Sequence, residues 1–259
     1  MKRAPRRIVC LSAEAADWLW RVGAWEQVAG VTAFFKQPSD IAPKPRVSGF
    51  SSARIEAVEE LNPDLIITFS DVQAKLTAGF IQRGFAVLAT NQRTLEETEE
   101  TLPLLGRVVG CERRSDELLD EFRNRLAPVA NIARRPRVYF EEWHDPLISG
   151  IGWVSELIER AGGSEIFGEL RGKRAAAERA VLPERVVQAD PEIILASWCG
   201  EQVKVDRIVA RPGWERLSAV RQQRVHEICS DDILQPGFRL VYGYERMKKL
   251  LGEVRDQKN

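Results

Sequence analysis

The sequence predicts an α/β fold of two lobes, each with a mostly parallel sheet, joined by one long bridging α-helix. Three observations predict it. Short apolar runs alternate with helical patterns, one helix-to-strand plan occurs twice, and a long segment without strand character separates the two copies. The length of 259 residues exceeds that of a usual single domain, which agrees with two lobes.

Seven apolar runs bounded by turn residues are the candidate strands. They are residues 8–11, 28–32, 65–69, 86–89, 138–140, 193–196 and 225–228. Helical spacing lies between several of them, as in residues 14–23, which stop at Gly23, and residues 55–61, which stop before Pro63. Strands that alternate with helices in this way favour parallel pairing.

A single plan of helix, turn and strand occurs twice. Residues 55–69 and residues 185–198 each end a helix, turn through Pro-Asp or Pro-Glu, and continue into an apolar strand. The starts of the two copies also match, because Arg7 opens Arg-Ile-Val-Cys-Leu and Arg137 opens Arg-Val-Tyr-Phe. Two copies indicate a duplicated lobe and not a solenoid.

Residues 95–135 carry no strand signal and form the predicted bridging helix. Their later apolar residues step by three and four, as one face of a helix does: Leu119, Phe122, Leu126, Val129 and Ala133. Gly106 and Gly110 are the points at which this helix can break. The predicted organisation is therefore an N-terminal lobe over residues 1–94, a bridging helix over 95–135 and a C-terminal lobe over 136–259.

Composition excludes several classes of protein. With 38 basic and 38 acidic side chains the chain has no general field for nucleic acid, and no apolar stretch approaches the roughly 18 residues of a membrane span. The four cysteines are scattered without a C-x-x-C pair, and residues 8–13 are too short for the apolar part of a leader. Both features favour the cytoplasm, or the periplasm if a leader was removed.

Several short segments, in this order and spacing, resemble one family. They are Arg7-Ile-Val-Cys-Leu-Ser, Gly30-Val-Thr, Pro45-Arg-Val-Ser-Gly-Phe-Ser-Ser, Leu61-Asn-Pro-Asp-Leu-Ile-Ile, Pro146-Leu-Ile-Ser-Gly, Ala161-Gly-Gly-Ser-Glu-Ile-Phe and Pro236-Gly-Phe-Arg-Leu. The pattern resembles the helical-backbone (class III) substrate-binding proteins of ABC transporters, and within them the cobalamin-binding family. The resemblance implies two Rossmann-like lobes and a non-catalytic protein that binds a corrinoid or an iron chelate in the cleft between them.

The resemblance also implies which loops contact the ligand, since the family uses those that follow the strand ends. The residues it selects are Phe34, Phe35, Phe50, Ser51, Phe69, Asp71, Trp143, His144, Leu147, Ser149, Trp198, Cys199, Asp231 and Gln235. Aromatic walls suit a flat macrocycle better than a sugar. The resemblance also implies that Glu184 matches one of two glutamates by which the family docks on a permease. At the position of the other glutamate this chain has Ala74.

His144 and Cys199 leave two alternatives open. His144 either lines the cleft or ligates the metal of a chelate, because neutral imidazole is a common metal ligand. A Cys199–His144 pair would instead make the chain a cytosolic enzyme, which requires a thiol with a depressed pKa. A third reading is an adaptor that binds no small molecule. The sequence predicts no resident cofactor, no catalytic residue and no protein-bound metal site.

Overall fold

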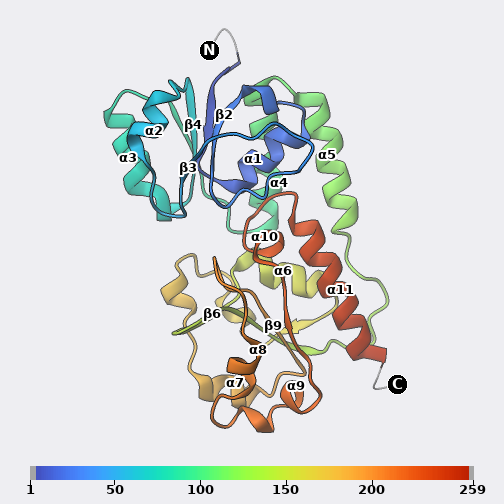
Figure 1. Ribbon diagram of the computed structural model, residues 1–259. Helices are drawn as coiled ribbons and strands as arrows, with labels where there is room; N and C mark the ends of the chain where they lie inside the picture. The colour runs from blue at the N-terminus through green and yellow to red at the C-terminus, as the bar shows by residue number, and fades with distance from the viewer. Residues whose placement is uncertain (1–3, 257–259) are drawn as a thin grey trace. The chain divides into compact units, whose positions relative to one another are not determined.

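The computed structural model describes residues 4–256 and divides into two compact units. The first unit runs to Gln92 and also contains Glu96–Arg123 and Pro236–Phe238. The second contains Arg93–Leu95, Asn124–Gln235 and the chain from Arg239 onward. Each unit has a sheet covered by helices, so the predicted two-lobed α/β class is confirmed (Figure 1).

The sheet of the first unit is parallel throughout, in the order β3-β2-β1-β4-β5. Its strands are β1 (Ile8–Cys10), β2 (Val28–Thr32), β3 (Arg46–Ser48), β4 (Leu65–Phe69) and β5 (Val87–Thr90). The central strand β1 is buried along its whole length, as expected of a strand covered on both faces. Since all strands run the same way, their carboxyl ends share one edge.

Helices cover both faces of this sheet (Figure 1). They are α1 (Ala13–Arg21), α2 (Ile55–Glu60), α3 (Ala74–Gln82), α4 (Leu95–Val109) and α5 (Glu112–Arg125). Val58 of α2 and Phe80 of α3 pack with Val9 and Ile66 of the sheet in one apolar cluster. On the other face, Nε1 of Trp18 in α1 donates a 3.2 Å hydrogen bond to Oγ of Ser115.

The segment predicted as one bridging helix consists of two helices, α4 and α5. The chain turns between them at Gly110, whose φ of +75° is open to glycine and strained for other residues. A Cβ atom at Gly106 would collide with the side chain of Ser115, so the missing side chain lets α4 and α5 approach closely. Of the five residues with helical apolar spacing, Leu119 and Phe122 lie in α5, whereas Leu126, Val129 and Ala133 follow the end of that helix and lie outside any helix.

The second unit has a mixed sheet in the order β10-β9-β6-β7, with β8 also paired to β6. Only β7 runs antiparallel within it. Its strands are β6 (Arg137–His144), β7 (Leu147–Ser149), β8 (Ser164–Glu165), β9 (Ile193–Ala196) and β10 (Val225–Glu227). Its helices are α6 (Gly152–Arg160), α7 (Pro183–Ala189), α8 (Val205–Val209), α9 (Ser218–Arg221), α10 (Ser230–Ile233) and α11 (Leu240–Asp256).

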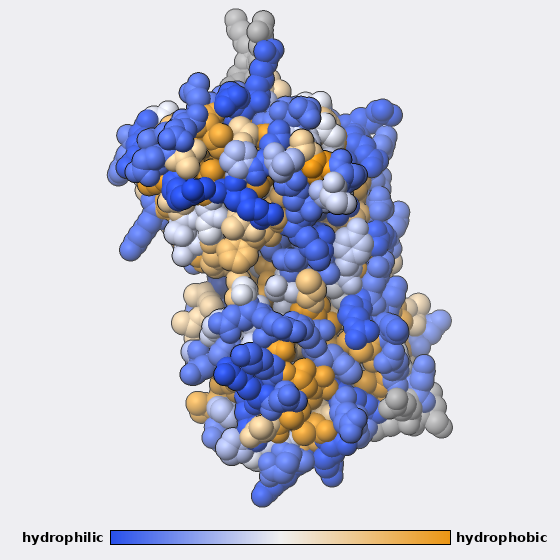
Figure 2. Space-filling view, in the orientation of Figure 1, coloured by the Kyte–Doolittle hydropathy of each residue, from blue (hydrophilic) through white to orange (hydrophobic). Residues whose placement is uncertain are grey.

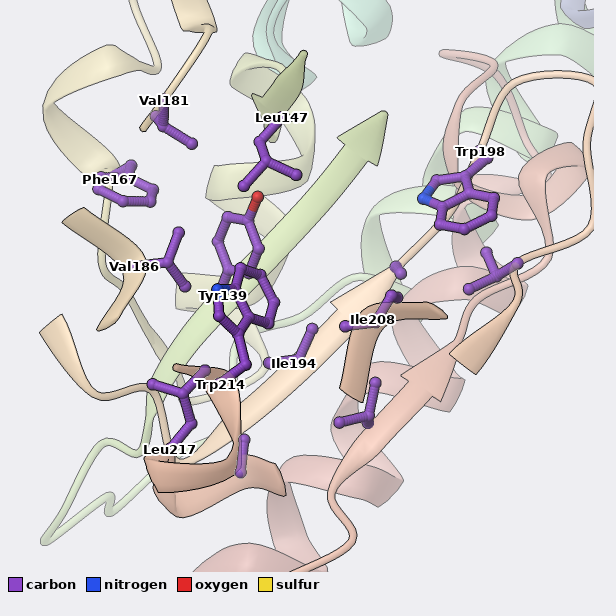
Figure 3. Close-up of a cluster of buried hydrophobic side chains, with 14 residues drawn as sticks. Tyr139, Leu147, Phe167, Val181, Val186, Ile194, Trp198, Ile208, Trp214 and Leu217 are labelled. Carbon is purple, nitrogen blue, oxygen red and sulfur yellow. The ribbon is translucent and has the colours of Figure 1, made fainter. Parts of the chain in front are cut away.

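An aromatic cluster forms one core layer of the second unit (Figure 3). Tyr139 of β6 makes edge-to-face contacts with Phe167, at 5.8 Å between ring centroids, and with Trp214, at 6.1 Å. Aliphatic side chains of α7, α8 and α9 complete the layer. Trp198 belongs to the same cluster but lies apart from the rings of Tyr139 and Trp214 (Figure 3).

The duplication is visible in hydrogen bonds, beginning with the first copy. The carbonyl oxygen of Arg7 accepts from the amide of Asp64 at 3.0 Å, and the Asp64 carboxylate accepts from the amide of Arg7. Nε of Arg7 donates to the carbonyl oxygens of Leu61 and Asn62 at 2.8 and 3.3 Å. Asn62 has φ +44°, so the arginine caps the carboxyl end of α2 where the chain reverses.

The second copy repeats this arrangement at equivalent positions. Arg137 and Glu192 exchange the same two hydrogen bonds, at 2.9 and 3.1 Å. Nε of Arg137 donates to the carbonyl oxygens of Ala189 and Asp190, and Asp190 has φ +42°. The repeat therefore preserves an arginine that joins the start of one strand to the helix before another strand.

Hydrophilic side chains dominate the face of the molecule shown in Figure 2. Within residues 4–256, no helix combines the length and apolarity needed to cross a bilayer.

Candidate functional site

The sequence-selected residues lie at the ends of strands or in the loops that follow them. In the first unit these loops follow β2, β3 and β4, and in the second they follow β6, β9 and β10. In open α/β sheets the carboxyl edge is the usual place for a ligand.

In the first unit, an aromatic pair stands at this edge. The rings of Phe34 and Phe50 meet edge to face with centroids 6.1 Å apart, and Phe50 is 49% exposed. Ser51 and Asp71 are also exposed, and Phe69 is half-buried. Phe35 is different, because it is buried and its ring packs on that of Trp25 with centroids 5.5 Å apart. Phe35, which the sequence selected as ligand-facing, therefore lies in the core of the first unit in this structure.

Gln73 connects the segments at the ends of β1, β3 and β4, a role that the sequence did not indicate. Its Nε2 donates to the carbonyl oxygens of Leu11 at 2.9 Å and Phe50 at 2.8 Å, and its Oε1 accepts from the amide of Phe69 at 3.0 Å. The side chain is buried, which strengthens these bonds relative to water. A polar residue soon after a strand was its only sequence signal.

In the second unit, three aromatic rings meet at the end of β6. The ring of His144 stacks on Trp143 with centroids 4.7 Å apart and tilts against Trp198 at 4.3 Å. Its buried Nε2 lies 3.5 Å from Oε2 of Glu201. The sequence placed this cluster in a loop, but β6 continues through His144 because β7 folds back and pairs with it.

A buried ion pair supports Trp198 from behind. Trp198 is 1% exposed, and its Nε1 donates a 3.1 Å hydrogen bond to Oε1 of Glu141. Arg211 donates to both oxygens of the same carboxylate, at 2.9 Å for Oε1. Its guanidinium also lies 4.5 Å from the ring centroid of Trp214. Glu141 is fully buried, so it depends on these partners.

A second ion pair supports the β6–β7 turn. Arg179 donates to both carboxylate oxygens of Glu142, at 2.6 and 2.9 Å, and also to the carbonyl oxygen of Ser149. Oγ of Ser149 donates in return to the carbonyl oxygen of Arg179. Ser149, Leu147 and Trp198, which the sequence selected as ligand-facing, are all buried in this structure.

Cys199 does not have the properties of a nucleophile. Burial, and secondarily the negative charge of Glu142, raise the pKa of its thiol above the ordinary value. Among residues 4–256, no hydrogen bond links Cys199 to His144. The enzyme alternative requires a depressed pKa, so the structure gives no support to a Cys199 nucleophile. Within the same described range, no group of three or more His, Cys, Asp or Glu residues is placed to hold a metal ion.

The remaining selected residues lie near α10 and on α7. Asp231 in α10 and Gln235 just after it are half-buried. Glu184 is exposed in the first turn of α7. Leu182, the residue just before this helix, is 65% exposed.

The repeat identifies Glu56 as the counterpart of Glu184. Glu56 in α2 lies seven residues before Pro63, and Glu184 in α7 lies seven residues before Pro191. The alignment also pairs Val58 with Val186, and both are fully buried. An acidic residue is therefore present at this position in both copies, whereas the resemblance points to Ala74 in the first.

Comparisons with known proteins agree with this geometry. Residues 8–231 match the model of the periplasmic binding protein family. A substrate-binding lipoprotein of an ABC transporter from Bacillus subtilis is 24% identical over 95% of this chain and 80% of its own length. A vitamin B12-binding protein of Vibrio parahaemolyticus is 23% identical over 89% of this chain and 83% of its own length.

Solved structures show the same fold. A periplasmic heme-binding protein from Roseiflexus superposes with a TM-score of 0.82 at 20% identity, over 96% of this chain and 99% of that one. The periplasmic vitamin B12 binding protein of Vibrio cholerae superposes with a TM-score of 0.76 at 21% identity, over 99% of this chain and 99% of that one. Together with the match over residues 8–231, the two duplicated α/β units establish that the chain belongs to the periplasmic binding protein family.

Proposed function

We propose that the chain binds a corrinoid or a related metal chelate, without changing it chemically, as the solute-binding component of an ABC transporter. The observation that carries the proposal is the stack of Trp143 and His144 at the carboxyl edge of the second sheet. The exposed ring of Phe50 supplies a comparable surface in the first unit. Flat aromatic faces suit a macrocycle, since they bury ring area without fixed polar geometry.

The relatives support this class of ligand. Proteins similar to this chain are named for binding vitamin B12 or heme, and one is named as a possible iron-binding protein. In the proposal His144 lines the surface and does not ligate the metal. Its Nε2 is covered and close to Glu201, so ligation through that atom requires the ring to turn away.

Delivery to a permease is the second part of the proposal. Glu56 and Glu184 occupy equivalent exposed positions in the two copies, and each can accept hydrogen bonds from a basic side chain of a membrane partner. The relatives include a lipoprotein and periplasmic proteins, which favours the periplasmic alternative over the cytoplasmic expectation.

Equilibrium dialysis against cyanocobalamin and ferric protoporphyrin tests the proposal. We expect saturable binding of at least one chelate at a single site, with recovery of the chelate unchanged. Trp143→Ala should weaken that binding about tenfold or more, because it removes one face of the stack. Absence of binding by every corrinoid and iron chelate offered would overturn the proposal.

A further inference from the structure

The two arginines that pair with glutamates of β6 in the second unit are already neutralised. The Arg179 side chain is 1% exposed, and both of its terminal nitrogens donate to Glu142. It also donates to the carbonyl oxygen of Ser149, so its position is fixed from two sides. A ligand at this surface cannot reach the guanidinium without breaking a buried ion pair.

Arg211 is likewise held in an ion pair with a buried carboxylate. It donates to both oxygens of Glu141, and Glu141 is fully buried. If Arg211 turned toward a ligand, it would leave an uncompensated carboxylate in the core, which is strongly unfavourable. Its packing on the ring of Trp214 fixes it further.

The charged groups that remain on these loops are mostly acidic. Nε2 of His144 faces the exposed carboxylate of Glu201. The other acidic side chains that follow or end these strands are Asp145 after β6, Glu227 at the end of β10, and Asp231 and Asp232 in α10. Asp232 is paired with Arg239, and Glu227 accepts a hydrogen bond from the amide of Val203. Lys204 is the basic side chain that adjoins this set on the β9–α8 loop.

From this distribution we infer that the second unit selects metal chelates that carry no net negative charge and no free carboxylate and are rich in amide groups. The inference rests on the proposed function and narrows its substrate class. A ligand carboxylate would be repelled by Glu201 and Asp231 and would find both arginines occupied, whereas a ligand amide could donate N–H groups to those carboxylates. Uncharged or cationic corrinoids fit this surface, and chelates with free carboxylates do not.

A matched series of ligands tests the inference by calorimetric titration at low and moderate salt. The series is cyanocobalamin, its monocarboxylic derivative in which one side-chain amide is hydrolysed, cationic aquacobalamin, and ferric protoporphyrin with its two propionates. We expect the monocarboxylic derivative to bind about tenfold more weakly than cyanocobalamin at low salt, with the difference shrinking as salt screens the charges. Aquacobalamin should bind at least as tightly as cyanocobalamin.

Charge variants identify the source of the selection. Glu201→Gln should reduce the difference between cyanocobalamin and its acid derivative about threefold. The control Glu215→Gln removes an exposed carboxylate of the same unit that precedes β10, toward the opposite edge of the sheet, and should leave the difference unchanged.

The outcomes separate the inference from the proposed function. If the acid derivative or ferric protoporphyrin binds as tightly as cyanocobalamin, the charge selection is overturned while chelate binding stands. An equal effect of Glu201→Gln and Glu215→Gln also overturns it. If no member of the series binds, the proposed function itself fails.

Discussion

The indole Nε1 of Trp198 donates a hydrogen bond of 3.1 Å to the carboxylate of Glu141, a residue with no exposed surface. This bond joins the segment just after β9 to β6, and the ring of Trp198 also contacts the ring of His144. The carboxylate therefore holds part of the aromatic surface in place without belonging to it. We expect changes to this buried pair to act first on stability and then on ligand affinity.

Removal of Arg211 should be strongly destabilising. Arg211→Met leaves the buried carboxylate of Glu141 without its positively charged partner. Breaking a buried pair in this way lowers the free energy of unfolding by about 3–5 kcal/mol. Urea denaturation followed by tryptophan fluorescence measures the loss. The control Arg216→Met removes an exposed arginine and should change stability by less than about 0.5 kcal/mol. Equal losses in the two variants would contradict a supporting role for Arg211.

The exposed ring of Phe50 should matter for binding and not for folding. Phe50→Ala removes contact area that a ligand would cover, so we expect affinity for a bound chelate to fall by about 1–2 kcal/mol with little change in the urea midpoint. Ile81→Ala, which shortens another exposed apolar side chain of the same unit, is the matched control. Dialysis of both variants against the chelate distinguishes a binding role from general surface apolarity.

Central strands could be predicted from the sequence because they are short apolar runs buried on both faces. Residues 28–32, 65–69 and 193–196 were predicted with the bounds that β2, β4 and β9 have. The strands β3, β7 and β8 were missed, since each has only two or three residues and lacks a continuous apolar run. Their pairing depends on neighbours distant in the chain, which local patterns do not record.

The candidate site could be predicted only in part. The rule that ligands bind at the carboxyl ends of parallel strands located the aromatic residues. Residue type alone could not distinguish the half-buried Trp143 from the buried Trp198. The supporting arginines were also missed, because Arg179 and Arg211 meet carboxylates 37 and 70 residues away. Such partners are chosen by tertiary packing and leave no spacing signal.

The two arginines of the internal repeat should contribute similar stability. Arg7→Ala and Arg137→Ala each remove hydrogen bonds to the carbonyl groups at the end of a helix. With typical net values per bond, we expect each variant to lose about 1–2 kcal/mol. Arg113→Ala, at an almost fully exposed position of α5, is the control and should be near neutral. A loss confined to one of the two repeat positions would show that their equivalence is only geometric.

The thiol of Cys199 should alkylate slowly. Its pKa is raised, so the reactive thiolate is scarcer at pH 7 than in a free cysteine. We expect iodoacetamide to modify Cys199 more slowly than it modifies a small cysteine peptide, as measured by mass spectrometry of the digest. The rate should also be insensitive to His144→Gln. Rapid modification that depends on His144 would revive the nucleophile hypothesis.

Glu165 should make stability depend on pH near neutrality. Burial raises the pKa of this carboxyl from 4.5 to about 7, and the nearby acids Glu169 and Glu159 add to the rise, against opposing contributions from Ser155 and Arg179. The folded state therefore favours the protonated acid. Its contribution to stability is fully present below the unfolded pKa of 4.5 and is lost as the pH rises through about 7.

Glu165→Gln tests this linkage because glutamine resembles the protonated acid at every pH. Between pH 5 and pH 8 we expect the parent to lose roughly 2–4 kcal/mol relative to the variant, with the variant the more stable at pH 8. Urea unfolding at each pH measures the difference, and comparison of the two proteins cancels titration that they share, such as that of His226. Parallel curves for parent and variant across this range would show that Glu165 ionises normally in the folded protein.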